Sequence, residues 1–261
     1  MRFLLEQDAY FLRGENHQQF SVMVRSTNQQ LFFHRSARVL FERAGEWTDL
    51  DEFVDSLHIT SVPRERVRSD YLDTVIDLYV AGVAQIKDLP VSNRTGCFLA
   101  HKRDVLALSP FLTENMDRGF SCSASNSRNY YAKSPLQARI KDKLDTICYY
   151  EENGRILAAL VLVFSDRNFG NRILTLQTVV VDGNLSEEQA EFCIGEVMRF
   201  IRLNIVKGLN KLRYEHIHER QDWIVHVLLK NGFTNTAVFP EELSTGQTLK
   251  LYDLFFESGP A

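Results

Sequence analysis

Hydrophobic positions in the first part of the chain follow a two-residue period and then a helical one. Three short apolar or alternating runs are separated by polar turns, which predicts a small antiparallel sheet. These strands are expected over residues 9–13, 19–25 and 30–35. Apolar residues at helical spacing follow, with Pro63 near the start of the longest stretch and Thr48 as the cap of the stretch before it. The helices are expected over residues 37–43, 49–57 and 63–86.

A different order of elements is expected in the rest of the chain. One strand and two helices come first, then three strands in succession, a long helix, a strand, a helix and two closing strands. The first three elements are assigned to residues 96–100, 103–115 and 136–145. The three strands are assigned to 146–151, 155–164 and 171–181, and the long helix to 186–207. The closing elements are assigned to 211–218, 221–230, 236–240 and 248–256.

The segment between these two parts consists mainly of turn-forming residues. Residues 89–96, Leu-Pro-Val-Ser-Asn-Arg-Thr-Gly, combine proline, serine, asparagine and glycine. We therefore predict a domain over residues 1–88, a linker over 89–96 and a second domain over 97–261. The fold class is α+β, with a small three-stranded sheet and three helices in a winged-helix-like order, followed by a mixed-sheet α/β domain. A loop rich in serine and asparagine, residues 117–135, interrupts the second domain.

Composition narrows the classes of partner. The 261 residues include 44% hydrophobic and 25% charged side chains, so both domains can form a core, and the net charge of −4 argues against nucleic-acid binding. Four cysteines lie far apart without the spacing of a metal site, so no metal is expected. The chain contains neither a signal peptide nor a membrane-spanning run, which predicts a cytoplasmic protein without membrane attachment. The oligomeric state is left open.

The third predicted strand and the helices after it carry a resemblance to a known family. The strand Leu31–Arg35 runs directly into Ser36-Ala-Arg-Val-Leu-Phe-Glu, and the short helix at Thr48 and the long helix follow. Over residues 6–86 this order resembles PqqD-like domains, the recognition elements for precursors of ribosomally made, modified peptides. The resemblance implies that the leader of a precursor peptide adds as a strand beside the third strand, in a groove walled by the third helix. On this chain the groove residues are Leu31, Phe32, Phe33, His34, Tyr71, Val75, Leu78 and Tyr79.

Two other interpretations of the first domain stay open. Aromatic residues at helical spacing are also typical of a core, so the domain can be a purely structural appendage. Binding to DNA would use Arg64, Arg66 and Arg68, but Glu65 and Asp70 on the same helix oppose their charge.

The second domain carries another resemblance, in its order of elements and in one local motif. The motif is Gln221–Phe233, a helix that begins with an amide side chain and ends in Lys-Asn-Gly-Phe. Over residues 97–257 these features resemble the GNAT acyltransferases. The resemblance implies a sheet splayed by a bulged strand, and transfer of an acyl group from a thioester of coenzyme A or of an acyl carrier protein. Residues implied in cofactor binding are Gln177, Val179, Val180, Val181, Gly183 and Gln221.

Two positions depart from the pattern of that family. The loop expected to wrap the diphosphate of coenzyme A reads Val181–Ala190, with one glycine, no arginine and three carboxylates. Within it, Ser186 and Gln189 have the spacing of a capping box, in which the side chains themselves satisfy the first amides of the helix. Leu228 occupies the position where members often have a tyrosine that protonates the leaving thiolate.

Candidate chemical groups lie beside the expected cleft. A base that accepts the proton of an attacking amine is sought among His216, His218 and Glu219, although the last two can also be solvated surface residues. Tyr130 and Tyr131, in the serine-rich loop, are expected to shape the acceptor side.

These features predict a maturation enzyme for a ribosomally synthesised peptide. The enzyme would bind the leader of the precursor peptide by strand addition and acylate an amine of the core peptide, with an acyl carrier protein as a further partner. The alternative is a catalytically inactive scaffold of the same fold, which binds a peptide for other maturation enzymes. A third option is a different reaction in the same cleft, such as decarboxylation or aminoacyl transfer.

Overall fold

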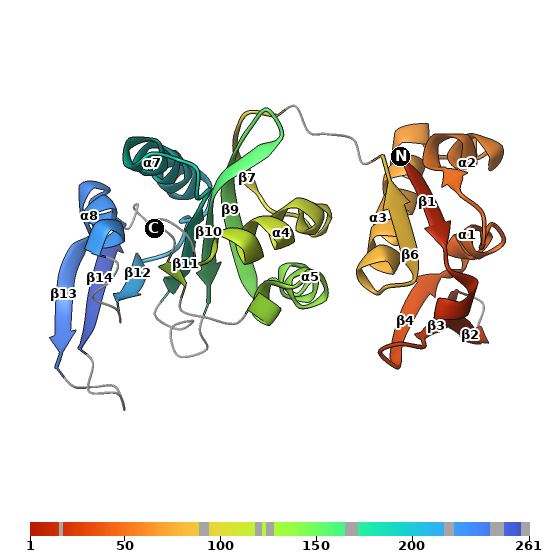
Figure 1. Ribbon diagram of the computed structural model, residues 1–261, viewed down its shortest axis with the longest axis horizontal. Helices are drawn as coiled ribbons and strands as arrows, with labels where there is room; N and C mark the ends of the chain where they lie inside the picture. The colour runs from red at the N-terminus through yellow and green to blue at the C-terminus, as the bar shows by residue number, and fades with distance from the viewer. Residues whose placement is uncertain are drawn as a thin grey trace. The chain divides into compact units, whose positions relative to one another are not determined.

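A computed structural model describes most of the chain, and Figure 1 shows the arrangement of its helices and strands. The described residues are 1–15, 18–88, 94–117, 122–123, 128–164, 172–216, 222–240 and 248–256. The chain divides into two compact units, Met1–Val91 and Ser92–Ala261. This division falls within the segment 89–96, where turn-forming residues predict a linker. Each unit has its own hydrophobic core.

The predicted three-stranded antiparallel sheet of the first unit is confirmed. It consists of β2 (Tyr10–Glu15), β3 (Gln19–Val24) and β4 (Gln29–His34), in the order β2-β3-β4. On β3, Phe20 and Val22 are buried in the core, as their alternation predicts. β4 lies at one margin of this sheet, and no described strand pairs with its outer edge.

A second small sheet, in the order β5-β1-β6, is not predicted by the sequence pattern. It joins β1 (Arg2–Leu5), β5 (Thr48–Asp49) and β6 (Ala84–Lys87). The predicted end of the long helix is therefore wrong: α3 (Arg64–Val80) stops at Gly82, whose φ of +77° is left-handed. Strands this short show no period of their own, and their partners lie far away in sequence, so only the folded chain reveals them.

Short helices complete the first unit. They are η1 (Gln7–Ala9), η2 (Arg35–Ala37), α1 (Arg38–Phe41) and α2 (Leu50–Ser56). Asp49, and not Thr48 as predicted, caps α2, because the Asp49 carboxylate accepts from the backbone N–H of Asp51 at 2.9 Å. Arg68 of α3 binds Asp51 at 2.7 Å, and this hydrogen bond lowers the pKa of that carboxyl. The pair ties α2 to α3.

One large mixed sheet forms the second unit, as the resemblance implies. Its strands run in the order β13-β14-β12-β11-β10-β9-β7, and the two-residue strand β8 pairs with β11 outside that path. Neighbours along the path are antiparallel except β11 and β12, which are parallel. The strands are β7 (Gly96–Leu99), β8 (Cys122–Ser123), β9 (Asp145–Glu152), β10 (Arg155–Val163), β11 (Ile173–Val181), β12 (Lys211–His216), β13 (Thr234–Phe239) and β14 (Leu249–Phe255).

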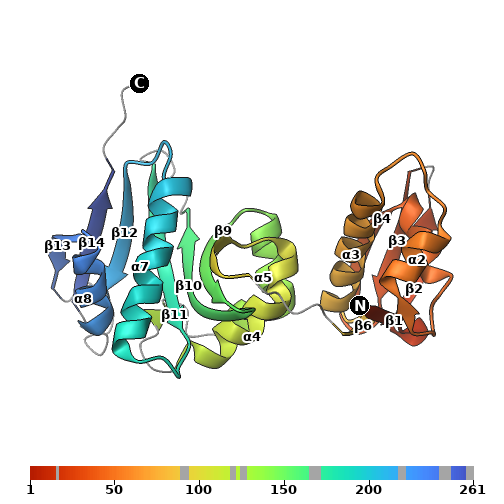
Figure 2. The same ribbon diagram turned by 90° about the horizontal axis from the view of Figure 1, so that it is seen from above.

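Helices pack on both faces of this sheet (Figures 1 and 2). α7 and α8 cover one face, and α4 and α5 cover the other, so residues 156–162 of the central strand β10 are all buried. The helices are η3 (Lys102–Asp104), α4 (Val105–Asn115), η4 (Arg128–Tyr131), α5 (Lys133–Lys141), α7 (Glu187–Asn204) and α8 (Asp222–Lys230). η4 and the start of α5 occupy part of the segment 117–135 that composition predicts as a loop.

Candidate functional site

Strands β11 and β12 form a fork in the large sheet. They pair in parallel only from Ile173–Leu176 on β11 and Lys211–Tyr214 on β12. β11 continues to Val181, whereas β12 ends at His216. A β-bulge lies at the point of divergence, because the register with β10 shifts so that Gln177 is the extra residue. The splayed and bulged strand that the resemblance implies is therefore present.

Two tyrosines of η4 lie directly against the bulge. The Tyr131 hydroxyl and Thr178 Oγ1 are 2.6 Å apart, and both side chains are fully buried. The Tyr130 hydroxyl donates to Gln177 Oε1 at 3.4 Å. Ser109 of α4 holds η4 in place by donating its Oγ to the Tyr131 carbonyl at 2.8 Å. The predicted acceptor-side tyrosines and the predicted cofactor residue Gln177 are thus brought together in space.

A mostly buried arginine supports the tyrosine pair. The guanidinium of Arg139, on α5, lies 3.6 Å from the centroid of the Tyr130 ring, a favourable cation–π geometry. Its Nε donates to Asp145 Oδ2 at 2.7 Å, which ties α5 to the start of β9. The Tyr130 ring is therefore held between Arg139 and the fork.

The chain itself occupies part of the fork. β8 pairs antiparallel with β11, with Ser123 opposite Thr178 and Cys122 opposite Val179. The same two residues of β11 pair with β10 on their other side, so β8 lies on the edge that faces β12. At this edge the resemblance implies backbone contacts with a pantetheine arm. A strand of two residues has no recognisable sequence pattern, so β8 is not predicted.

The predicted cofactor residues at the end of β11 are core residues. Val179, Val180 and Val181 are fully buried, and Val179 and Val181 belong to the core cluster beneath α7. A ligand in the fork would therefore meet backbone groups of this stretch and not its side chains. Gly183 follows in the loop that leads into α7.

Three amides of this loop, those of Gly183, Asn184 and Leu185, have acceptors within the chain. Gly183 N donates to Asn115 Oδ1, at the end of α4, with a distance of 3.0 Å. Asn184 N donates to Asp182 Oδ1 at 3.0 Å, and Leu185 N donates to the Asp182 carbonyl at 3.1 Å. Burial opposes ionisation of Asp182, but hydrogen bonds from Asn184 and from Arg155 outweigh it and hold the pKa of that carboxyl below its usual range. Asn115 has no sequence signal that links it to this loop.

Side chains of the chain itself also bond to amides at the start of α7. The predicted capping box is confirmed: Ser186 N donates to Gln189 Oε1 at 2.9 Å, and Gln189 N donates to Ser186 Oγ at 3.3 Å. Glu187 and Glu188 lie in the same turn, where the helix dipole favours carboxylates and where they would repel an anion. The residues of this loop therefore do not fit the diphosphate of coenzyme A.

A cavity of about 830 Å³ opens beside the loop, between the β9–β10 hairpin and α7. Tyr150 and Phe192 form an aromatic wall, with ring centroids 6.0 Å apart in an edge-to-face geometry. Glu152, Glu188 and Arg155 also line the cavity, but Arg155 is bound to Asp182. Its lining comes from β9, β10, α7 and the loop before it, so it is separate from the fork.

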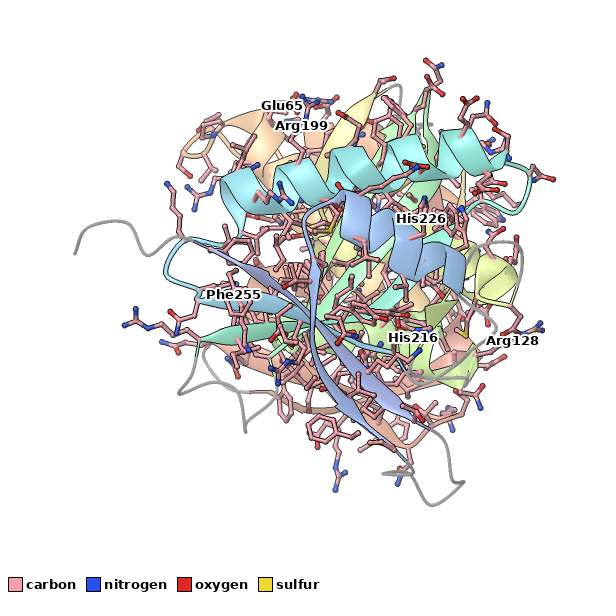
Figure 3. The ribbon with its side chains drawn as sticks, turned by 90° about the vertical axis from the view of Figure 1, so that its left-hand side faces the viewer. Glu65, Arg128, Arg199, His216, His226 and Phe255 are labelled. Carbon is pink, nitrogen blue, oxygen red and sulfur yellow. The ribbon has the colours of Figure 1, made fainter. Side chains whose placement is uncertain are left out.

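Of the candidate bases, the structure describes only His216. This residue, labelled in Figure 3, ends β12 and is buried. Its ring centroid lies 6.0 Å from that of Tyr214 and 6.2 Å from that of Tyr252. Leu228, at the position of the family's tyrosine, is a fully buried core residue. The other predicted site residues of this region lie outside the described residues: His218, Glu219 and Gln221.

In the first unit, a cavity of about 390 Å³ lies between the end of β4, η2 and the first half of α3. Three predicted groove residues line it, namely Phe33, His34 and Tyr71, and the Tyr71 hydroxyl donates to the Ser36 carbonyl at 3.1 Å. The remaining lining residues, which the sequence pattern does not single out as groove residues, are Ser36, Ala37, Ile59, Val62, Val67, Asp70 and Thr74.

Other predicted groove residues lie elsewhere. Val75 and Leu78 are fully buried in the core of the first unit and do not line the cavity. Phe32 is 66% exposed and lies on the sheet face opposite to that of Phe33. Leu31 and Tyr79 are partly buried and pack against the core.

The outer edge of β4 carries a regular set of backbone groups. Arg35 N donates to the Gln18 carbonyl at 2.8 Å, which fixes the phase of the ladder between β3 and β4. With this register, alternate residues of β4 bond to β3, and the N–H and C=O groups of Gln30, Phe32 and His34 face outward. An extended chain beside β4 would pair with these three residues.

No protein-family model and no curated protein matches the sequence. Several solved structures are similar in fold. A ribosomal-protein-S5-alanine acetyltransferase from Vibrio fischeri has 11% identity and a TM-score of 0.49, covering 63% of this chain and 94% of its own. An acetyltransferase of the GNAT family from Streptococcus pneumoniae has 12% identity and a TM-score of 0.47, covering 61% of this chain and 98% of its own.

A third similar structure is yncA from Salmonella typhimurium, which contains acetyl-CoA as its cofactor. It has 13% identity and a TM-score of 0.46, and covers 64% of this chain and 97% of its own. Because all three TM-scores lie below 0.5, we base the fold on the strand order, the fork and the bulge of this chain. None of the described helices combines the length and the apolar character that a membrane span needs.

Proposed function

We propose that this protein is a peptide-directed acyltransferase, which binds an extended segment of a peptide and transfers an acyl group from a thioester to an amine of that peptide. The observation that carries the proposal is the fork: β11 leaves β12 after Leu176, and its bulge at Gln177 lies beside the Tyr130 and Tyr131 pair. A bulge in the middle of a sheet leaves backbone groups without regular ladder partners, and these groups suit the binding of a polar ligand.

The transfer forms a C–N bond and breaks a C–S bond. The amine nitrogen attacks the thioester carbonyl, the sulfur leaves as a thiolate, and the proton of the amine passes to a base. We propose His218 or Glu219 as that base. The thiolate needs a proton, and Tyr130 is the group we propose to supply it, since its hydroxyl bonds to Gln177 at the bulge and Leu228 stands where the family often has a tyrosine.

The first unit supports the peptide part of the proposal. The outward backbone groups of β4 offer a guest chain main-chain hydrogen bonds, and the cavity beside Phe33 and Tyr71 offers a pocket for one of its side chains. Asp70, at this cavity, favours a guest side chain with a positive charge nearby. A peptide that resembles the leader of a ribosomally made precursor is the guest we propose.

Product mass tests the transfer. Tagged peptides encoded by genes beside the gene of this protein are incubated with the protein and an acetyl thioester. We expect a mass increase of one acetyl group on an amine of one peptide, and a rate reduced at least about tenfold by Tyr130→Phe. A rate unchanged in Tyr130→Phe would remove this tyrosine from the proposed role, and the absence of any acyl product would overturn the transferase.

Backbone substitution tests the strand addition. Phe32→Pro removes an N–H that faces outward and leaves the bonds to β3 in place, whereas Phe32→Ala removes only the side chain. For the peptide that is acylated, we expect Phe32→Pro to weaken binding about tenfold relative to Phe32→Ala, with equal thermal stability. Equal affinities of the two variants would contradict strand addition on β4.

A second candidate function is a non-catalytic peptide-binding scaffold. The observation that favours it is that the chain itself bonds to the groups a cofactor would need. β8 pairs with β11 inside the fork, and amides of the loop before α7 donate to Asn115 and to Gln189. Calorimetry with the peptide, combined with a search for acyl product by mass, separates the two candidates. A peptide that binds, together with the absence of any acyl product from every thioester, would favour the scaffold.

A further inference from the structure

We infer that this protein recognises its thioester without the nucleotide part of coenzyme A, and that Asn115 is the residue that makes the site indifferent to the diphosphate. The inference rests on the proposed function and names the donor class: thioesters on a pantetheine-length or shorter handle, for which the nucleotide adds no affinity. Three independent features of the described residues carry it.

Five amides at this helix start already have acceptors within the chain, namely those of Gly183, Asn184, Leu185, Ser186 and Gln189. Asn115 Oδ1 accepts from Gly183 N at 3.0 Å, in the place that a phosphate oxygen would need. The amides of Asn184 and Leu185 are held by Asp182, and those of Ser186 and Gln189 are held by the capping box. An anion that bonds to any of these five amides would have to displace an acceptor that the chain itself provides.

Charge near the loop opposes a diphosphate as well. Glu187 and Glu188 lie in the first turn of α7, and Glu152 lines the same cavity as Glu188. The nearby cation, Arg155, donates its Nε to Asp182 at 2.7 Å and is neutralised by it. Among the described residues that line this cavity, Arg155 is the single cationic one, so the field at the loop is negative.

The described side chains beside the bulge in the fork, by contrast, carry no charge. These side chains are Gln177, Thr178, Tyr130 and Tyr131, all without formal charge at neutral pH. The edge of β11 that faces β12 pairs with the strand β8 through backbone groups, so this edge can bond to amides. Pantetheine contains two amides and no charge, and this chemistry fits an edge that accepts a peptide backbone.

Calorimetry with three ligands tests the inference without an assay of activity. The ligands are pantetheine, phosphopantetheine and coenzyme A, which share one arm and differ only in phosphate and nucleotide. We expect neither phosphopantetheine nor coenzyme A to bind more tightly than pantetheine, because the nucleotide makes no favourable contact and the negative field opposes its phosphates. As salt is raised from about 50 mM to about 300 mM, we expect coenzyme A to bind more tightly, because salt screens the repulsion between its phosphates and the carboxylates. The affinity for pantetheine, which has no charge, should not change.

A variant tests the role of Asn115. Asn115→Ala frees Gly183 N for a phosphate oxygen, and we expect coenzyme A to gain about tenfold in affinity relative to pantetheine, the effect of one charge-assisted hydrogen bond. Asn204→Ala is the matched control: Asn204 Nδ2 bonds the carbonyl four residues earlier at 2.9 Å, as Asn115 Nδ2 does at 3.0 Å, but Asn204 lies at the far end of α7. We expect no change of preference in Asn204→Ala.

The outcomes separate this inference from the proposed function. Coenzyme A that binds wild-type protein at least about tenfold more tightly than pantetheine, with affinity falling as salt rises, would overturn the inference and leave the transferase in place. An Asn115→Ala variant that folds and shows the wild-type preference would remove Asn115 from its role. If none of the three ligands binds, the fork is not a thioester site, and both proposals fail together.

Discussion

Single hydroxyl groups decide the local structure of the fork. Tyr131 and Thr178 are both fully buried, so each hydroxyl has to find its partner within the protein, and each finds the other. Tyr130, one position earlier, keeps a longer bond of 3.4 Å and is only partly buried. Tyr131 is therefore expected to contribute more to stability than its neighbour Tyr130.

We expect Tyr131→Phe to lower the free energy of unfolding by about 1 to 3 kcal/mol, because the Thr178 hydroxyl would remain buried with one partner fewer. Tyr130→Phe should cost less than about 1 kcal/mol. Urea denaturation of the second unit checks both values. The double variant Tyr131→Phe, Thr178→Val should recover part of the loss, and a Tyr131→Phe variant as stable as wild type would contradict the pairing.

Burial changes the ionisation of two cysteine thiols. Burial raises the pKa of Cys148 to about 12 and of Cys193 to about 11. At neutral pH both are protonated and unreactive, which agrees with their position in the core cluster. The folded protein holds these protons more tightly than the unfolded chain does, so this stabilisation is complete at neutral pH and is lost at high pH.

The free energy of unfolding should therefore fall as the pH rises above about 9, by up to about 1.4 kcal/mol per pH unit for each such thiol. Cys148→Ala removes one of these groups. Between about pH 9.5 and 11 its stability should fall less steeply than that of wild type, by about 1.4 kcal/mol per pH unit. Chemical denaturation across this range measures the two slopes, and parallel slopes would refute the assignment.

At the scale of elements, one carboxylate joins the three strands at the end of the large sheet. Asp253 on β14 is 1% exposed, and Arg213 on β12 donates to it at 2.8 and 3.0 Å. Lys211 also binds it, and Thr236 on β13 donates to it at 3.1 Å. Burial opposes its ionisation, but the bonds from Arg213 and Lys211 outweigh it and lower the pKa of this carboxyl.

Asp253→Asn should destabilise the second unit by about 3 kcal/mol, because two cations would keep a buried site without a counter-charge. In wild type the stabilisation is present above the pKa of an unfolded Asp, about 4, and is lost as the pH falls below it; the variant should lack this loss. Urea titrations at pH 7 and 3 measure both effects. The control Glu191→Gln, in the exposed pair with Lys230, should cost under about 1 kcal/mol.

At the scale of the whole molecule, the chain consists of two units with separate cores, joined through residues 89–96. In the proposed function, the first unit holds the peptide and the second acts on it. A tether of this kind raises the effective concentration of the acceptor amine to about millimolar, so that a weak acceptor site suffices.

Dividing the chain after Val91 tests this arrangement. Met1–Val91 should bind the acylated peptide within about threefold of the affinity of the full chain, since β4 and its cavity lie inside this unit. Micromolar mixtures of the two pieces should acylate the peptide at least about 100-fold more slowly than the intact chain. Equal rates would mean that peptide capture by the first unit does not serve the transfer.

Most elements of this fold are predictable because they are long enough to show a period. Strands β9, β10 and β11 and helix α7 carry it over eight residues or more, and their expected bounds agree with the structure within a few residues. β1, β6 and β8 are too short for this, and each pairs with a strand distant in sequence. The end of α3 was mistaken because apolar residues of β6 extend its stripe.

The amino-acid sequence by itself determined the two-part organisation, the order of the larger elements, the capping box at Ser186 and Gln189, and the absence of an arginine from the loop before α7. These are local properties, fixed by residues close together in the chain. Tertiary structure alone decided that Asn115 reaches Gly183, that β8 enters the fork, and that Val75 and Leu78 face the core. Contacts between distant segments depend on how whole elements pack, and no local pattern encodes that packing.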